Sequence, residues 1–175
     1  QFLFAENKFE ETIETLREAE LPLATAGIKG SELSADFLRA ESLRMLGSLS
    51  DARTLLEEIL TESEAHQIPL LSTRCLTALG LTAKAANDPG NAEMYFKKAV
   101  SMVENLRTPL PSEDFRTAFF GDKLKPYEEL ARICLDGENR VSEAFEHVEK
   151  SRSRTLVEMI RRSRREPETK VDLAD

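Results

Sequence analysis

The sequence has no tryptophan, only two cysteines and two histidines, and seven glycines and seven prolines among its 175 residues. So few turn-forming residues argue against an all-β sandwich or barrel, which needs many tight turns. Two cysteines are too few for a disulfide framework or a four-cysteine zinc site. No apolar run approaches the roughly 20 residues that a membrane-spanning helix needs, so we expect no transmembrane helix and no membrane partner.

The residue patterns that usually carry chemistry are also missing from the sequence. His66 and His147 have no second histidine or cysteine at metal-ligand spacing. There is no phosphate-binding glycine loop and no nucleophile elbow. We interpret the many aspartates and glutamates as solubilising charges on helix surfaces. The sequence therefore predicts no catalytic residue, no metal and no cofactor, so we do not expect an enzyme.

Positive charge is concentrated in one short segment of the sequence. The chain has a net charge of −8, yet residues 150–165 contain seven lysines and arginines against the single acid Glu158. The acidic surface of the rest disfavours nucleic acid as a partner. The basic segment also lacks interleaved aromatic residues on which bases could stack. It could cap or contact a neighbouring domain, or bind an acidic protein; a nucleic-acid partner is the reading we favour least.

Apolar residues at helical spacing occur throughout most of the sequence. Thr12, Ala52 and Ala92 recur at intervals of 40 residues, each followed by apolar or small residues four and seven positions later. The segments 37–46 and 76–86 carry apolar residues at spacings of three and four, which predicts one buried helix face. The expected fold class is all-α, an α-solenoid of antiparallel helix hairpins with repeats of about 40 residues.

Small residues at matching positions indicate how two helices of one hairpin meet. Ala40 and Gly80 lie in the first helices, and Ala52 and Ala92 lie in the second ones. Small side chains let two helix backbones approach closely. We expect Ala52 to lie at such a close contact.

Several residues predict where helices begin and end. Asn7 and Ser48, each with an acid three residues later, are predicted N-caps. Pro69 and Pro89 suit the first turn of a helix. Pro22 is expected to kink or end the first helix.

The interval between Ala92 and Ala144 is 52 residues, so about 12 residues have been added between residues 105 and 137. In this region Ser112 can cap a helix. Apolar residues from Phe120 to Cys134 follow at steps of three and four. They predict one long helix of about 24 residues with a kink at Pro126.

The pattern of small residues resembles that of tetratricopeptide repeat proteins with slightly lengthened helices, over about residues 1–151. The run after residue 148 resembles the segment of bacterial proteins in which such repeats lead into a caspase-like CHAT domain. The residues that match that pattern are Glu149, Ser151, Arg152, Arg154 and Leu156. In that family the His and Cys of the peptidase-like domain lie further on. The resemblance therefore implies a regulatory or partner-binding part of such a protein.

We predict a helical repeat domain over residues 1–165, with about 3.5 to 4 repeats, and a polar linker over 166–175. The chain does not begin with Met, and we expect it to be a piece of a longer protein. The absence of a signal-like segment, together with cysteines placed in helical stripes, favours the reducing cytoplasm.

Two candidate sites follow from these patterns. The resemblance to tetratricopeptide repeats implies a partner-binding groove lined by Phe37, Glu41, Arg44, Arg74, Thr77, Leu81 and Lys84. The end of the last helix, predicted over residues 141–165, carries domain-contact residues Arg152, Arg154, Leu156 and Ile160. We expect a protein or peptide partner with acidic and apolar residues in the groove, and contact of the last helix with a following domain or with a second copy.

Three functions remain open at this point. The first is a non-catalytic scaffold that binds a protein or peptide and regulates an attached effector domain. The second is the sensor part of a bacterial transcription regulator, and the third is the regulatory arm of a CHAT peptidase. A peptidase-like domain beyond residue 175 would favour the third, and a helix-turn-helix would favour the second.

Overall fold

The computed structural model describes residues 4, 6–25, 29–107, 124–136 and 140–151, and within these ranges the only regular structure is helical. The chain divides into two compact units, Gln1–Pro109 and Leu110–Asp175. The helices of the first unit are α2 (Phe9–Thr25), α3 (Lys29–Met45), α4 (Leu49–Ala65), α5 (Pro69–Ala85) and α6 (Pro89–Arg107). The second unit contains α8 (Lys125–Asp136) and helical residues 141–151.

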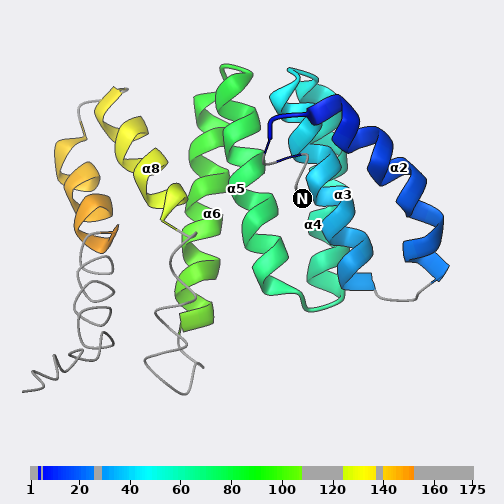
Figure 1. The fold of residues 1–175 in the computed structure, drawn as a ribbon. Coiled ribbons are helices and arrows are strands. Elements are labelled where there is room, and N and C mark those ends of the chain that lie inside the picture. The colour runs from blue at the N-terminus through cyan, green and yellow to red at the C-terminus, as the bar shows by residue number, and fades with distance from the viewer. Residues whose placement is uncertain (1–3, 5, 26–28, 108–123, 137–139, 152–175) are drawn as a thin grey trace, which may run out of the picture. The chain divides into compact units, whose positions relative to one another are not determined.

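The five helices of the first unit begin at residues 9, 29, 49, 69 and 89, a constant interval of 20 residues. The first four helices each have 17 residues. Helices of equal length joined by short turns alternate in direction, as Figure 1 shows. The 40-residue interval predicted from the sequence therefore corresponds to two helices and two turns.

The turns that the structure describes in this unit share one geometry. Asn7, Gly47, Gln67 and Asn87 have positive φ angles between 55° and 85°, and each lies two residues before the next helix. The residue after the turn donates its N–H to a carbonyl five residues back, as in Ser48 to Leu43 at 2.9 Å. This is the bonding pattern of the Schellman motif. The same bond joins Ile68 to Ser63 at 2.8 Å and Asp88 to Ala83 at 2.9 Å.

The predicted helix ends are partly correct. Pro69 and Pro89 are the first residues of α5 and α6, as expected. Asn7 is not an N-cap, because α2 begins two residues later and Asn7 has the left-handed conformation of the preceding turn. Ser48 stands at the N-cap of α4, but its side chain makes no capping hydrogen bond.

Two further helix-end features differ from the sequence interpretation. Pro22 does not end α2, which continues to Thr25. The side-chain cap that the sequence reading missed is Asp88, whose Oδ1 accepts the backbone N–H of Asn91 at 3.1 Å. The Asn91 amide donates to Asp88 Oδ2 at 2.6 Å, and these bonds hold the pKa of Asp88 below its ordinary value.

Packing in the first unit joins consecutive helices, each to the next, and also joins α3 directly to α5. All-helical structure with this packing is consistent with the predicted α-solenoid. The shared core is made of buried side chains from α3, α4, α5 and α6: Leu33, Phe37, Ala40, Leu56, Ile59, Leu71, Cys75, Leu76, Ala78, Leu79, Tyr95 and Ala99.

The small residues of the repeat pattern are buried, and one of them, Gly80, lies at a close contact. Ala40, Ala52 and Ala92 are fully buried. A Cβ atom on Gly80 would lie 2.5 Å from Cε1 of the Phe96 ring, which is closer than van der Waals contact allows. The absence of a side chain at Gly80 therefore makes room for an aromatic ring in the second helix of the hairpin.

In the second unit the predicted 24-residue helix is wrong. Leu124 is not helical, and α8 begins at Lys125 with Pro126 in its first turn. A proline is favoured there because the first-turn N–H groups have no helical partner, so it starts a helix rather than kinking one. Ser112 and Phe120 lie outside the described residues.

The buried face of α8 contains Tyr127, Leu130 and Cys134, each fully buried. The Arg140 N–H donates to the Cys134 carbonyl at 2.9 Å and connects α8 to the helical residues 141–151. In the ranges that the structure covers, no helix combines the length and apolar character needed to cross a lipid bilayer.

Candidate functional site

The predicted groove residues lie on two helices that contact each other. Phe37, Glu41 and Arg44 belong to α3, and the other four belong to α5. These two helices pack directly against each other although α4 separates them in the sequence (Figure 1). We call the seven predicted residues together with Leu70 the α3–α5 surface.

Arg74 and Phe37 form the direct link between the two helices. The guanidinium carbon of Arg74 lies 4.3 Å from the centroid of the Phe37 ring. Phe37 is 5% exposed and belongs to the core, whereas Arg74 is exposed. A guanidinium over an aromatic face is stabilised by about 0.5–1 kcal/mol at exposed positions. The groove therefore presents the cation of Arg74 with the aromatic ring beneath it.

Arg44 is occupied within its own helix. Its Nε donates to Glu41 Oε1 at 2.7 Å and its Nη2 donates to Glu41 Oε2 at 3.0 Å. Both side chains are less than one-fifth exposed. This two-bond arrangement fixes both groups and neutralises the charge that α3 contributes to the surface. The spacing of three residues on a helix was the sequence signal for this pair.

Four predicted residues and Leu70 follow one stripe along α5. Leu70, Arg74, Thr77, Leu81 and Lys84 are separated by steps of four, three, four and three, so they share one helix face. Leu70 is 45% exposed and was missed by the sequence interpretation, although it continues the same spacing by one turn. At 1.5 Å per residue the stripe is about 21 Å long.

The charge of α5 is unusual for this chain. The helix contains Arg74 and Lys84 but no acidic residue, in a protein whose net charge is −8. Thr77 and Leu81 are half-buried between the two cations, and the Thr77 hydroxyl donates to the Thr73 carbonyl at 2.9 Å. The stripe thus offers apolar contact flanked by positive charge.

Cys75 lies beneath this surface and is fully buried. Burial raises the pKa of its thiol to about 12, opposed by the nearby Arg74 and reinforced by the charge of Glu41. A thiol with this pKa is protonated at neutral pH and is a poor nucleophile. Cys75 is therefore a core residue.

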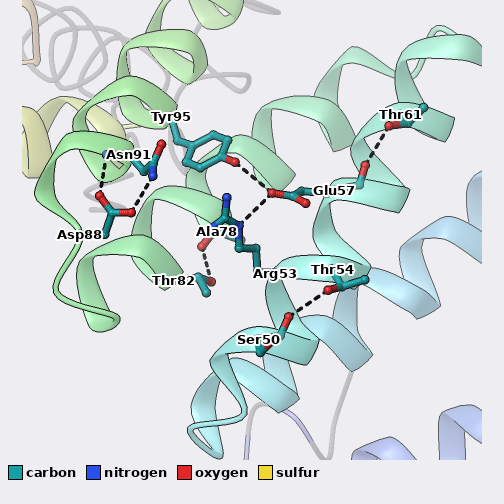
Figure 2. Close-up of polar contacts among 10 residues, drawn as sticks. All are labelled: Ser50, Arg53, Thr54, Glu57, Thr61, Ala78, Thr82, Asp88, Asn91 and Tyr95. Atoms are coloured by element: carbon teal, nitrogen blue, oxygen red, sulfur yellow. Dashed lines mark hydrogen bonds and ion pairs between the residues drawn. The ribbon is translucent and has the colours of Figure 1, made fainter.

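A second polar cluster, which the sequence interpretation missed, joins α4 and α6 (Figure 2). The Tyr95 hydroxyl donates to Glu57 Oε1 at 3.1 Å, and Arg53 Nε donates to the same oxygen at 2.9 Å. Burial raises the pKa of Tyr95, and the Glu57 carboxylate raises it further. Only the Arg53–Glu57 spacing of four was visible in the sequence, because Tyr95 is 38 residues from Glu57.

The predicted domain-contact residues Arg152, Arg154, Leu156 and Ile160 lie outside the described residues. The helical residues 141–151 before them carry two exposed apolar side chains, Val141 at 54% and Phe145 at 63%. Within the residues that the structure describes, no group of three or more His, Cys, Asp or Glu side chains could hold a metal ion.

Comparisons of the chain with protein-family models, with curated proteins and with solved structures find no match in any of the three.

Proposed function

We propose that this chain is a non-catalytic helical scaffold of tetratricopeptide type that binds a protein or peptide along the α3–α5 surface. The observation that carries the proposal is the contact between Phe37 and Arg74, which joins the first helices of two hairpins into one surface. Solenoids use such surfaces, built from successive repeats, to bind extended partners. The constant interval of 20 residues between helix starts supports the repeat interpretation.

The chemistry of the surface fits binding better than catalysis. Its acid, Glu41, is bonded to Arg44, and the thiol beneath it is protonated at neutral pH. The stripe on α5 presents apolar side chains and the cation of Arg74 to a partner. A partner segment that lies along this stripe needs about seven extended residues to cover its length.

The experiment selects peptides of about 10 residues from a random displayed library on the purified 175-residue chain. Binders are then located by a photoreactive amino acid placed at Thr77. The matched control is the same group at Thr61, an exposed threonine of α4 whose hydroxyl also bonds a carbonyl of its own helix. We expect crosslinks from position 77 and not from position 61. No enriched peptide, or crosslinking from position 61 alone, would contradict the proposal.

We also propose that the end of the chain contacts an effector domain through Arg152, Arg154, Leu156 and Ile160. Two exposed apolar side chains in the preceding helical segment, Val141 and Phe145, support this assignment. If the gene continues into a peptidase-like domain, reversing the charges of Arg152 and Arg154 should weaken the association of the separately produced domain with the repeats. An unchanged association would remove these arginines from the contact.

A further inference from the structure

We propose that the α3–α5 surface selects peptide segments with an aspartate or glutamate side chain, whose carboxylate binds Arg74, followed by an apolar residue that packs on Leu81. This inference rests on the proposed function and adds the chemistry of the partner. It concerns a side-chain carboxylate within a segment and does not require the end of the partner chain.

The first argument is that Arg74 differs from the other arginines whose side chains are described in its unit. Within the described residues Arg74 has no ion pair and no hydrogen bond, and its guanidinium lies over the Phe37 ring. Arg17, Arg39, Arg44 and Arg53 each pair with a carboxylate. An exposed guanidinium without a carboxylate stands out in a chain that has 32 acidic residues.

The second argument is the position of the Arg74 side chain. Its guanidinium carbon lies over the Phe37 ring, 4.3 Å from the ring centroid. The N–H donors of a guanidinium point outward in its plane, where a carboxylate can accept two of them at once. Stacking on a buried ring restricts the side chain before any partner arrives, which lowers the entropy cost of binding.

The third argument concerns the charge of the ligand. Glu41 and Arg74 each lie near enough to Cys75 for their charges to influence its thiol. The Arg44 guanidinium pairs with the Glu41 carboxylate, so the single positive charge of Arg74 is left to attract an anion, and one carboxylate matches that charge. Because α5 has no acidic residue, no carboxylate of this helix repels a negative charge that binds beside Arg74.

The fourth argument is the spacing along α5. Arg74 and Leu81 are seven residues apart, about 10 Å along the helix, and about three residues of an extended peptide cover that distance. Leu81 is half-buried and Lys84 is exposed one turn further on. The surface thus fits an acidic residue beside Arg74 followed by an apolar residue beside Leu81.

The test uses the tightest peptide from the library selection, synthesised with an amidated C-terminus so that only side chains carry carboxylates. Its affinity is measured by fluorescence anisotropy for the wild-type chain, Arg74→Gln and Arg74→Lys. The control variant is Arg17→Gln, which removes the charge of an exposed arginine on α2. Circular dichroism checks that each variant retains its helical content.

We expect Arg74→Gln to weaken binding about tenfold or more and Arg74→Lys to weaken it less, because lysine keeps the charge but loses the planar fork. Arg17→Gln should change the affinity less than about twofold. Replacing the peptide's Glu by Gln should weaken binding to the wild type and have little further effect on Arg74→Gln.

The outcomes separate this inference from the proposed function. If peptides crosslink at position 77 but are not acidic, or bind Arg74→Gln as tightly as wild type, the surface binds peptides and Arg74 is not the carboxylate site. If the library yields no binder, both the peptide-binding function and this inference are wrong.

Discussion

Gly80 and Phe96 form a matched pair across the α5–α6 contact: a Cβ on Gly80 would lie 2.5 Å from one ring carbon and 2.7 Å from another. Forty residues earlier the corresponding residues are Ala40 and Leu56, both of which are fully buried. Glycine at position 80 is thus matched with the large phenylalanine at position 96. Alanine at position 40 is matched with the smaller leucine at position 56.

We predict that Gly80→Ala destabilises the protein by about 1–2 kcal/mol, although alanine favours a helix, because overpacking against a buried ring costs more than the helix propensity gains. Phe96→Leu alone should cost a similar amount through the space it leaves. The double variant recreates the Ala40–Leu56 combination and should recover most of the loss. Urea unfolding followed by circular dichroism measures the coupling, and additive losses would show that the two positions are independent.

Ala52 gives a second test of close packing. It is fully buried on α4, so Ala52→Leu forces three extra carbon atoms into a filled contact and should cost about 1–3 kcal/mol. The neighbouring Asp51 is exposed, and Asp51→Leu adds a leucine to the same helix without that clash. Equal unfolding free energies for the two variants would mean that α4 does not pack tightly at Ala52.

The raised pKa of Cys75 predicts how stability depends on pH. Between about pH 9 and 12 the thiol ionises in the unfolded chain but stays protonated in the folded one. The folded state then binds more protons, so this group makes stability fall as pH rises through that range. Cys75→Ala should remove this contribution, and the difference in unfolding free energy between wild type and variant should narrow from pH 8 to pH 10.5. If the difference in unfolding free energy stays constant between these pH values, the raised pKa of Cys75 is wrong.

The hydrogen bond between Tyr95 and Glu57 joins two helices that are not neighbours in sequence. Tyr95→Phe removes the hydroxyl and should cost about 0.5–1.5 kcal/mol. In Glu57→Gln the acceptor is neutral, so adding Tyr95→Phe to that variant should cost less than it does in the wild type. A double-mutant cycle by urea denaturation tests this, and a coupling near zero would show that the bond contributes nothing to stability.

Features set by local spacing were predictable from the sequence. The periodicity of apolar residues predicted the helices, and Pro69 and Pro89 marked helix starts because a proline's missing N–H costs nothing there. Pro126 obeys the same rule, but the apolar steps that continue across it suggested a longer helix. Local pattern cannot decide between a helix that begins at a proline and one that is kinked by it.

Features that depend on tertiary packing were not predictable in the same way. Phe37 and Arg74 lie on two helices whose apolar spacing was visible in the sequence, but their contact depends on how α3 packs against α5. Similarly, Gln67 adopts a left-handed conformation because the turn requires it, although glutamine has no special preference for that region. Its position, midway between Gly47 and Asn87, was the available signal.

The pairing of each helix mainly with the next one has a consequence for how the chain folds. Each hairpin closes contacts between residues that are at most about 40 positions apart, and proteins dominated by such local contacts fold quickly. During synthesis at the ribosome, α3 can pack on α2 before α4 has emerged, and each later helix meets a partner that is already folded. The first unit can therefore assemble in the order in which it is translated.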